Sequence, residues 1–416
     1  MFYPCSFLAQ IRCRRGLAAA ALAVALVSPS LVYAADAVSG GYSPDVDYGR
    51  GSVVVGSDGN AYRALDAVKG KDPVGAKDTV WQLAQAAFDI TLDVPGRFDS
   101  IEKAFAFIAG ATISDTATVT VQLAPGTYEL NAPLSIGHFH GRRVEFKGGK
   151  DPAKTLLTFT RGSGIIIDDG KSLRIEGLTL KGGQTGLLVD HGAYAILTRV
   201  AMKDFRTSIL VENGSTLSAD QVDIEANDGD NGISVNSTSR GQLTNCRISR
   251  PPASSPSKNF SFGITAGTCA SIVAHDCEVS GWGTGVLANR SGAIVLVGCK
   301  ASGNGEGGAA YLTSTFQADN CSFNKNRERG VYLNAGMANL ANCEIRDNKK
   351  IGISSSNNSV VDFGGAPCVI SGSEVGLHSF RGGRFHGVRP QLKDNAKDLD
   401  VFPANSTQDD PFFLTR

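Results

Sequence analysis

Residues 299–348 read CKASGNGEGGAAYLTSTFQADN, then CSFNKNRERGVYLNAGMANLAN, then CEIRDN. Each block begins with a cysteine, and the two complete blocks have the same length. Each opens on an apolar-x-apolar pair, continues through an Asn- and Gly-rich turn, and reaches further short apolar segments. Alternation within such segments sends one side chain inward and the next outward. A unit of short strands and tight turns that repeats every ~22 residues is typical of one rung of a parallel β-helix.

The repeat extends in both directions at the same phase. Cys277, Cys299, Cys321 and Cys343 are evenly spaced, whereas the step from Cys246 to Cys277 is longer. The longer step contains a Pro- and Ser-rich loop at residues 251–259. The sequence therefore predicts an all-β parallel β-helix over residues 95–390. We call the first residue of each rung, the place that the cysteines occupy, its phase position. The phase positions are Leu178, Val200, Val222, Cys246, Cys277, Cys299, Cys321, Cys343 and Cys368.

The cysteines and asparagines of the repeat are interpreted as structural. Seven cysteines follow the N-terminal segment, without the spacing of a disulfide framework or a zinc site. Those in phase are expected to stack inward as small apolar side chains. One Asn column lies five residues after the phase position and another directly before it, where stacked amides bond to one another and left-handed turns are tolerated. The members are Asn227, Asn304, Asn326, Asn348, and Asn245, Asn320, Asn342.

Residues 1–34 have the pattern of a secretory signal peptide. Arg12, Arg14 and Arg15 precede a short apolar run, Leu17–Val27, and a small-x-small cleavage pattern follows. This run is too short to span a bilayer, and no later segment is apolar enough to do so. We therefore expect a secreted or periplasmic protein without a membrane span. Cleavage leaves 40 minus 3, or 37, basic residues against 40 acidic ones, which argues against nucleic acid as the partner.

The ends of an open solenoid need caps, because the terminal strands have unpaired edges. The stretch Asp99-Ser100-Ile101-Glu102 starts a helix with a capping-box pattern, and we interpret this helix as the N-terminal cap. Residues 391–416 are irregular and polar, and are expected to form a C-terminal cap or tail.

Residues 40–85 differ from the repeat in composition. Strand-like segments at 53–55 and 61–64 flank a Gly-Ser-Asp-Gly-Asn turn, which predicts a β-hairpin. The pattern Tyr48-x-x-Gly51-x-Val53, Gly59-x-x-Tyr62-x-Ala64, Gly70-x-x-Pro73 and Trp81 resembles the small chitin-binding modules of bacterial chitinases. The resemblance implies a small β module that binds sugar through exposed aromatic rings, here those of Tyr62 and Trp81. The alternative interpretation is that both rings form the core of the module.

The stretch from Phe98 to Gly149 resembles the start of pectin-lyase-like β-helix proteins, and more closely of phage tailspike and tail-fibre β-helices. The matching residues are Ser100-Ile101-x-x-Ala104, the segment 119–128 and His138-x-x-Gly141. The resemblance implies a right-handed helix, and it allows a trimer because tailspike relatives are often trimeric. Such folds carry lyases, hydrolases, esterases, epimerases and non-catalytic binders, so the function has to be argued from a site. The active-site motifs of pectin methylesterases, polygalacturonases and alginate epimerases are missing here.

Charged turns after the first strand of each rung are expected to stack into a polar stripe that suits an extended glycan. Trp282 interrupts the Asn column and is expected either to stack on a sugar or to fill a turn. Glu306 and Lys349 are candidate substrate-binding residues. Asp228 and Asp230, two residues apart, are candidates for the carboxylate pair of a glycosidase, whose members lie about 5–9 Å apart.

A polysaccharide lyase would use a different set of residues from the same stripe. Arg327 and Arg329 are candidates for the base and for the cation that neutralises a uronate carboxyl group. The acidic turn around Asp228 offers oxygen ligands to Ca²⁺. Alternatively, Glu306 and Arg329 are stacked neighbours that only form an ion pair. No other metal or cofactor is predicted, since His138 and His140 lack a third ligand.

These observations favour a secreted, polysaccharide-active protein, either a lyase or a glycoside hydrolase acting on an extracellular or cell-surface glycan. The alternative is a non-catalytic β-helix that binds glycans or adheres to surfaces. The missing active-site motifs support this alternative.

Overall fold

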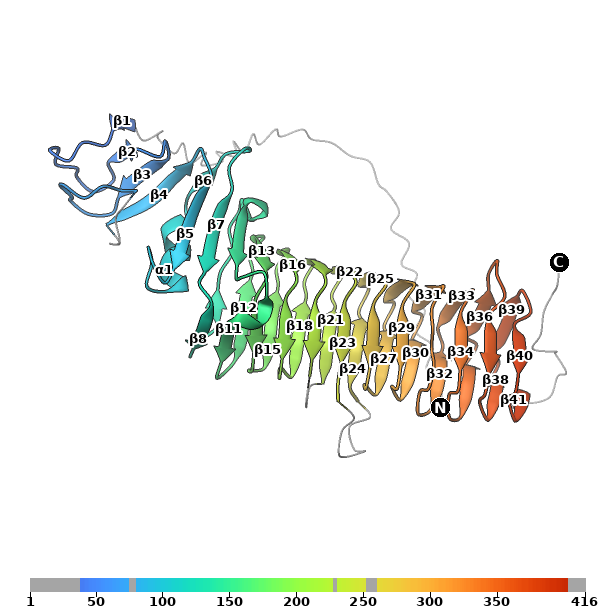
Figure 1. Cartoon of the computed structure of the whole chain (residues 1–416). Coiled ribbons are helices and arrows are strands. Elements are labelled where there is room, and N and C mark those ends of the chain that lie inside the picture. The colour runs from blue at the N-terminus through green and yellow to red at the C-terminus, as the bar shows by residue number, and fades with distance from the viewer. Residues whose placement is uncertain (1–37, 75–79, 227–229, 252–259, 403–416) are drawn as a thin grey trace, which may run out of the picture. The chain divides into compact units, whose positions relative to one another are not determined.

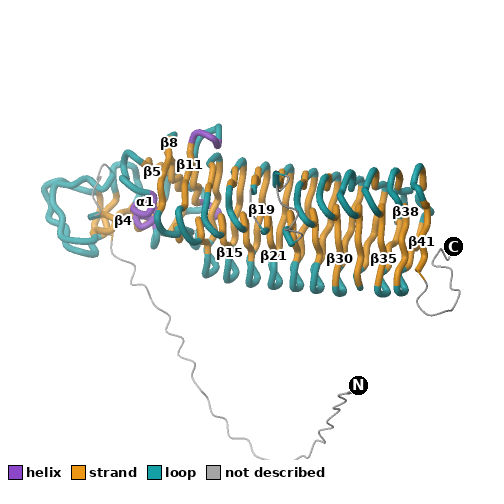
Figure 2. The backbone as a smooth tube through the Cα atoms, turned by 90° about the horizontal axis from the view of Figure 1, so that it is seen from below, coloured by secondary structure: helices purple, strands orange, loops and turns teal. Residues whose placement is uncertain are grey.

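The computed structural model describes residues 38–74, 80–226, 230–251 and 260–402, and shows a solenoid of parallel strands preceded by a small β module (Figures 1 and 2). Residues 1–37, which include the expected signal peptide, and residues 403–416 lie outside this description. Three sheets, called I, II and III below, run along the solenoid. A complete rung contributes one strand to sheet I, then one to sheet II, then one to sheet III, whereas the rung that begins at Cys321 has only single bridges at its sheet II position. The predicted parallel β-helix is therefore confirmed.

Sheet I has 13 strands. They are β5 (Ile90–Val94), β7 (Val119–Leu123), β10 (Val144–Lys147), β13 (Ser172–Glu176), β16 (Tyr194–Thr198), β19 (Thr216–Asp220), β22 (Arg240–Thr244), β25 (Ser271–His275), β28 (Ala293–Val297), β31 (Thr315–Asp319), β33 (Met337–Ala341), β36 (Val360–Phe363) and β39 (Arg384–Gly387).

Sheet II comprises eight strands and then three more, which single bridges through Ser322 connect. They are β8 (Gly126–Leu130), β11 (Thr155–Phe159), β14 (Thr179–Lys181), β17 (Ala201–Lys203), β20 (Asp223–Glu225), β23 (Arg247–Ser249), β26 (Glu278–Ser280), β29 (Lys300–Ser302), β34 (Glu344–Arg346), β37 (Val369–Ser371) and β40 (Gln391–Lys393).

Sheet III has 12 strands. They are β9 (Leu134–Ser135), β12 (Ser163–Ile167), β15 (Thr185–Val189), β18 (Thr207–Val211), β21 (Asn231–Val235), β24 (Phe262–Ala266), β27 (Thr284–Ala288), β30 (Glu306–Tyr311), β32 (Arg329–Asn334), β35 (Ile351–Ser356), β38 (Val375–Phe380) and β41 (Lys397–Phe402). Two short 3₁₀ helices, η1 (Gly141–Arg143) and η2 (Pro152–Lys154), lie between early strands.

The solenoid is longer than the predicted span of 95–390. Its first strand, β5, pairs with β7 and starts before residue 95. At the other end, β40 pairs with β37 and β41 pairs with β38. Residues 391–402 are thus strands of the solenoid rather than an irregular cap, and their polar composition reflects side chains on an exposed outer face.

The predicted phase is confirmed by the register of sheet II. Residues directly after consecutive phase positions are Cα partners, as in Asp223 with Arg247 and Arg247 with Glu278. The phase residues themselves are buried, with at most 4% of their surface exposed. The six in-phase cysteines form the predicted inward column, so their small apolar side chains fill the corner between sheets I and II.

The residue before each phase position makes the turn between sheets I and II. Its backbone is left-handed before each phase position from Leu178 to Cys343, with φ of 52° at Asn245, 53° at Asn320 and 50° at Asn342. This conformation costs Asn little free energy, because its short side-chain amide forms hydrogen bonds with nearby backbone groups. The amide of Asn342 also donates to that of Asn320 in the rung below. The predicted structural role of this Asn column is confirmed.

The second Asn column is a buried ladder at the turn between sheets II and III. The Oδ1 atom of Asn326 accepts the backbone N–H of Asn304 at 3.0 Å, and that of Asn348 accepts the N–H of Asn326 at 3.0 Å. The Nδ2 group of Asn326 donates to the Ala301 carbonyl at 3.2 Å and to Asn348 Oδ1 at 2.9 Å. These amides satisfy turn groups that water cannot reach. Asn227, expected in this column, lies outside the described residues.

The N-terminal end is covered by the predicted helix, α1 (Ile101–Ile108), which contacts β4, β5 and β7. Its N-cap is Ser100, whose Oγ accepts the Lys103 N–H at 3.3 Å. Because Lys103 rather than Glu102 occupies the third helical position, only this half of the capping box forms. The buried face of α1 includes Ile101, Ala104, Phe105, Phe107 and Ile108.

The module before α1 contains the predicted hairpin, in which β2 (Val53–Val55) pairs antiparallel with β3 (Ala61–Ala64). Its sheet also includes β1 (Val38–Gly41), β4 (Trp81–Ala86) and β6 (Thr112–Ile113). Since β6 follows α1 in the chain, the sheet of the module contains strands from both sides of the cap helix. The resemblance to a chitin-binding module stays a prediction.

Replacing Asn326 with Ala should destabilise the protein strongly. The substitution removes the acceptor for the Asn304 N–H and the donor for the Ala301 carbonyl inside a dry turn. We expect a loss on the order of 3 kcal/mol in the free energy of unfolding, because buried groups left unpaired cost about 1–3 kcal/mol each. Urea denaturation followed by circular dichroism measures this. Asn339→Ala, at an exposed strand position of sheet I, is the control. Equal midpoints for the two variants would contradict the ladder's role.

Candidate functional site

The outer face of sheet III carries a connected set of polar and aromatic side chains in the last five rungs. In β32, Val331 and Leu333 point into the core, so the intervening Tyr332 points outward. Strands β30 to β41 lie side by side there (Figure 1). The outward position of Tyr332 recurs in register as the outer column, which consists of Leu287, Ala309, Tyr332, Ser354, His378 and Asp400.

A carboxylate–guanidinium pair lies beside this column. Glu306, only 9% exposed, accepts from Arg329 Nη1 at 2.6 Å and from the Tyr311 hydroxyl at 2.9 Å. The Thr284 hydroxyl contacts the same carboxylate oxygen as Tyr311, at 3.4 Å. Burial and the neighbouring Glu306 charge raise the pKa of Tyr311, so this phenol stays protonated and donates. The predicted ion pair between Glu306 and Arg329 is confirmed.

Tyr332 and Arg329 form the aromatic and cationic centre of the same face. The Arg329 guanidinium lies 4.3 Å from the centroid of the Tyr332 ring. The Tyr311 ring meets Tyr332 edge-on, with centroids 5.5 Å apart. This arrangement combines a partly exposed ring with a cation that is already oriented by a buried carboxylate. Such a pair suits a ligand that offers both an apolar ring face and a negative charge.

Three residues of the outer column continue this network in consecutive strands. Ser354 Oγ lies 3.1 Å from Nδ1 of His378, and His378 Nε2 lies 3.8 Å from Oδ2 of Asp400. Lys397 contacts the other oxygen of Asp400 at 2.5 Å and lowers the pKa of this carboxyl group. Burial lowers the pKa of His378 and outweighs the opposing charge of Asp400, so the imidazole is neutral at pH 7.

The predicted glycosidase pair cannot be evaluated as a pair, because Asp228 lies outside the described residues. Asp230 forms an ion pair with Arg206 of the preceding rung, at 2.5 Å. Its assignment as a catalytic carboxylate stays a prediction.

Trp282 is a core residue. Its indole is 0% exposed, and Nε1 donates to the Ile248 carbonyl at 3.2 Å. Glycines make room for the ring, since a Cβ at Gly232 or Gly263 would lie 3.3 or 3.1 Å from it. Asn304 accepts the Trp282 backbone N–H at 3.0 Å, so the turn keeps its ladder bond. Of the two expectations for Trp282, turn filling is the one that the structure shows, and stacking on a sugar is wrong.

The basic residues of the predicted stripe have separate environments. Arg327 donates to the Trp282 carbonyl at 3.1 Å, which fixes it over the turn between sheets II and III. Lys349 is exposed at the same turn of the next rung. Arg329 belongs instead to the outer face of sheet III. The stripe therefore divides into a turn surface and a strand surface, and only the latter joins several functional groups.

The aromatic residues expected to bind sugar in the N-terminal module are buried. Tyr62 is 0% exposed, and its hydroxyl donates to Asp58 at 2.5 Å. Trp81 is 1% exposed, and its Nε1 donates to the Lys71 carbonyl at 2.9 Å. Both rings therefore form the core of the module, which was the alternative interpretation. Their assignment as exposed binding residues is wrong because both rings, from β3 and β4, point into the core of the module.

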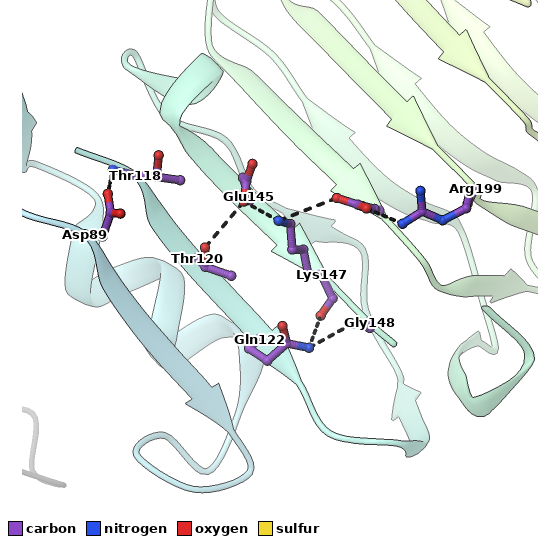
Figure 3. A network of polar contacts seen from close by, with 9 residues as sticks. Asp89, Thr118, Thr120, Gln122, Glu145, Lys147, Gly148 and Arg199 are labelled. Carbon is purple, nitrogen blue, oxygen red and sulfur yellow. Dashed lines mark hydrogen bonds and ion pairs between the residues drawn. The ribbon is translucent and has the colours of Figure 1, made fainter. Parts of the chain in front are cut away.

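A second polar network lies on sheet I near the N-terminal cap (Figure 3). Lys147 contacts Glu145 at 2.5 Å and Glu176 at 3.6 Å, and Glu176 also pairs with Arg199. Gln122 donates to the Gly148 carbonyl at 2.8 Å and so ties β7 to the loop after β10. Two cations balance two carboxylates here. We interpret the network as structural: its ion pairs and hydrogen bonds hold the first rungs of the solenoid together.

Side chains of the types that bind metal ions are dispersed over the part of the chain that the structure describes. There, no cluster of three or more His, Cys, Asp or Glu side chains is arranged to hold a metal ion. His138 is 2% exposed, and its Nδ1 accepts the His140 N–H at 3.0 Å. Among the same residues, no helix is long and apolar enough to cross a membrane.

Sequence reasoning missed the role of His378, which looked isolated. The signal was its spacing from Ser354 and Asp400, which lie one rung before it and one rung after it. In each of these strands the outward residue follows a buried aliphatic one, Ile353, Leu377 or the less buried Leu399. Aligning the third strand of every rung, rather than the cysteine phase, would have brought the three residues into one column.

The three-sheet geometry defines the chain as a right-handed parallel β-helix protein. Residues 154–251 and 254–388 match the sequence model for the right handed beta helix region, so the chain belongs to that family. Comparison with curated proteins finds no match.

Several solved structures are similar to this fold at low sequence identity. The A-module of an Azotobacter vinelandii mannuronan C-5 epimerase is 14% identical, with 70% of this chain and 91% of that chain covered and a TM-score of 0.39. A periplasmic alginate epimerase is 10% identical, with 76% and 84% covered and a TM-score of 0.43. The catalytic domain of a GH87 α-1,3-glucanase in complex with tetrasaccharides is 11% identical, with 81% and 68% covered and a TM-score of 0.44.

Trp282→Ala should lower the stability of the protein. Removing a fully buried indole costs about 3–5 kcal/mol. Thermal unfolding measures the loss, and Trp282→Phe, which keeps most of the ring volume, should lose less. Tryptophan fluorescence gives a second readout, because both tryptophans are buried and iodide should quench neither. Strong quenching that Trp282→Phe removes would show an accessible indole and contradict this placement.

Proposed function

We propose that this protein binds and acts on a polysaccharide that lies along the outer face of sheet III between β30 and β41. The observation that carries the proposal is the connected set of Tyr332, Arg329, Glu306 and His378 on one outward face. Location outside the cytoplasm, expected from residues 1–34, is part of the same proposal.

Rigid presentation supports binding of an extended chain. Strands β32, β35 and β38 of this face pair with a neighbour on each side, and β41 pairs with β38. The side chains of these strands are therefore held at a fixed spacing from rung to rung. Arg329 is oriented by Glu306 before any ligand arrives. A ligand therefore meets groups that lose little conformational freedom on binding. The cations Arg329 and Lys397 favour a glycan that carries carboxylates, such as a polyuronate.

Of the two chain-cleaving reactions expected from the sequence, the described residues favour a lyase. On this face Glu306 bonds to Arg329 and Tyr311, and Asp400 bonds to Lys397. Glu306 in β30 and Asp400 in β41 are four strands apart, roughly 19 Å at about 4.8 Å per strand, which exceeds the roughly 5–9.5 Å separation of a glycosidase pair. A lyase needs a cation at the uronate carboxyl group and a nearby base. Arg329 supplies the cation, which is one of the two roles expected for it from the sequence.

A non-catalytic glycan-binding or surface-adhesion protein is the second candidate. The hydrogen-bonded pairing of Glu306 with Arg329 and Tyr311 supports it, because these groups already have partners within the protein. A trimeric assembly stays a prediction.

The purified protein should bind uronic-acid polysaccharides better than neutral ones. Tyr332→Ala and Arg329→Gln should each weaken binding by at least about tenfold, since they remove the ring or the cation at the centre of the face. Titration calorimetry with a panel of glycans measures the affinity. Arg247→Gln, which removes an equal charge from the exposed face of sheet II, is the control.

Thermal unfolding of each variant has to precede these titrations, because Arg329→Gln also leaves Glu306 without its ion pair. Ultraviolet absorbance of unsaturated products then reports a lyase, and new reducing ends without that absorbance report a glycosidase. Binding without either product would establish the second candidate. Affinity that falls equally in the control, or that is absent for every glycan, would refute the proposal.

A further inference from the structure

The stack of Ser354, His378 and Asp400 has the composition of a site for nucleophilic catalysis. The three residues occupy the same outward position in β35, β38 and β41, where they are consecutive Cα partners. A hydroxyl, an imidazole and a carboxylate in contact order are the parts that activate a serine for attack on an acyl carbon. Their recognition depends on geometry rather than on their order in the chain.

The first contact of the stack couples the nucleophile to a base. Ser354 Oγ and His378 Nδ1 are 3.1 Å apart, within reach of a hydrogen bond. When Nε2 carries the ring proton and faces Asp400, Nδ1 has a free lone pair. The Ser354 hydroxyl then donates to Nδ1, which is the arrangement required for removal of its proton.

The second contact orients the imidazole. Asp400 Oδ2 lies 3.8 Å from His378 Nε2, and Lys397 holds the other carboxylate oxygen at 2.5 Å. An ionised carboxylate on that side favours the tautomer with the proton on Nε2 and stabilises the imidazolium that forms during reaction. Lys397 keeps Asp400 ionised, so the carboxylate does not compete for the proton.

We propose that Ser354, His378 and Asp400 form a site that hydrolyses small acyl esters, with O-acyl groups of a bound glycan as the substrate class. Ser354 Oγ attacks the acyl carbon while His378 takes the hydroxyl proton. The tetrahedral intermediate then expels the sugar oxygen, which receives that proton from His378. Water, deprotonated by His378, then attacks the acyl carbon, and the Ser354 oxygen leaves and takes that proton back from His378. Each cycle therefore consumes one water and yields an alcohol and a carboxylic acid.

Neighbouring groups limit which esters fit. Ser354 is 3% exposed and is flanked in register by Tyr332 and His378, so only a small acyl group, such as acetyl, can reach its oxygen. The Tyr332 hydroxyl accepts from Ser356 Oγ at 3.5 Å, and in the proposed site it would donate its own proton to the oxyanion that develops on the acyl carbonyl, since Tyr332 is the register partner of Ser354. The assignment of a glycan ester rests on the proposed function, whereas ester cleavage itself does not.

Hydrolysis of p-nitrophenyl acetate by the purified full chain tests the site without any glycan. We expect repeated turnover, and a fall in kcat/KM of about 100-fold or more for Ser354→Ala and for His378→Ala, because they remove the nucleophile or the base. Asp400→Asn should lower the rate less. p-Nitrophenyl octanoate should react much more slowly than the acetate, since its acyl chain exceeds the space beside Ser354.

Ser234→Ala is the matched control, because Ser234 occupies the equivalent outward position of β21 without a histidine in register. A fluorophosphonate probe gives an independent readout: mass spectrometry should locate the label on Ser354, and His378→Ala should abolish labelling. Absence of turnover, or equal rates for Ser354→Ala, Ser234→Ala and the parent protein, would overturn the inference. Ester turnover without glycan binding would sustain the inference while refuting the proposed function. Glycan binding without ester turnover would sustain the proposed function while refuting the inference.

The pH profile of ester hydrolysis should follow His378. The groups that bear on its charge are Asp400 and Lys397 of β41 and Arg329 of β32. Because burial lowers the pKa of His378, the base is neutral above that value and the rate should be constant near pH 7. The rate should fall only below the ordinary histidine pKa of about 6.5. A midpoint above that value would contradict the proposed base.

Discussion

A single left-handed residue at the corner between sheets I and II is the constraint on which the solenoid depends. It turns the chain within one residue, so from Leu178 to Cys343 the next residue enters the core at the same place in each rung. Arg199, Asn245, Asp276 and Asn320 share this conformation although their side chains differ. The loop at residues 251–259 lies at the corner between sheets II and III, and the strands of sheet II on either side of it keep the same register.

The solenoid was predictable because the corner residue and the buried residue after it recur in the sequence as Asn and Cys. The same signal explains why the cysteines turned out to be packing residues. The last two strands were missed because Gln391–Lys393 and Lys397–Phe402 carry neither marker and expose charged side chains. Their pairing is determined by the edge that the previous rung offers. Because this pairing depends on tertiary contacts, no local sequence pattern predicts these two strands.

The candidate site was only partly predictable. The ion pair of Glu306 with Arg329 followed from rung alignment, because residues in register across parallel strands must touch. Trp282 was misleading, since a large ring among glycines looks exposed in sequence while those glycines hollow out the space that buries it. The column of Ser354, His378 and Asp400 belongs to strands whose distance from the cysteine phase varies with turn length. Alignment on the cysteines therefore hides it.

The helix α1 and the first strands lie at the N-terminal end, and each later rung pairs with the one made before it. Neighbour-only contact of this kind allows folding to propagate from one end. A polypeptide emerging from a translocation channel N-terminus first would complete its cap before the remainder appeared. Every subsequent coil would find a finished template rather than wait for distant partners. The proposed Ser354 site would be assembled only when β41 pairs with β38, so the nucleophile would be activated late in such a folding order.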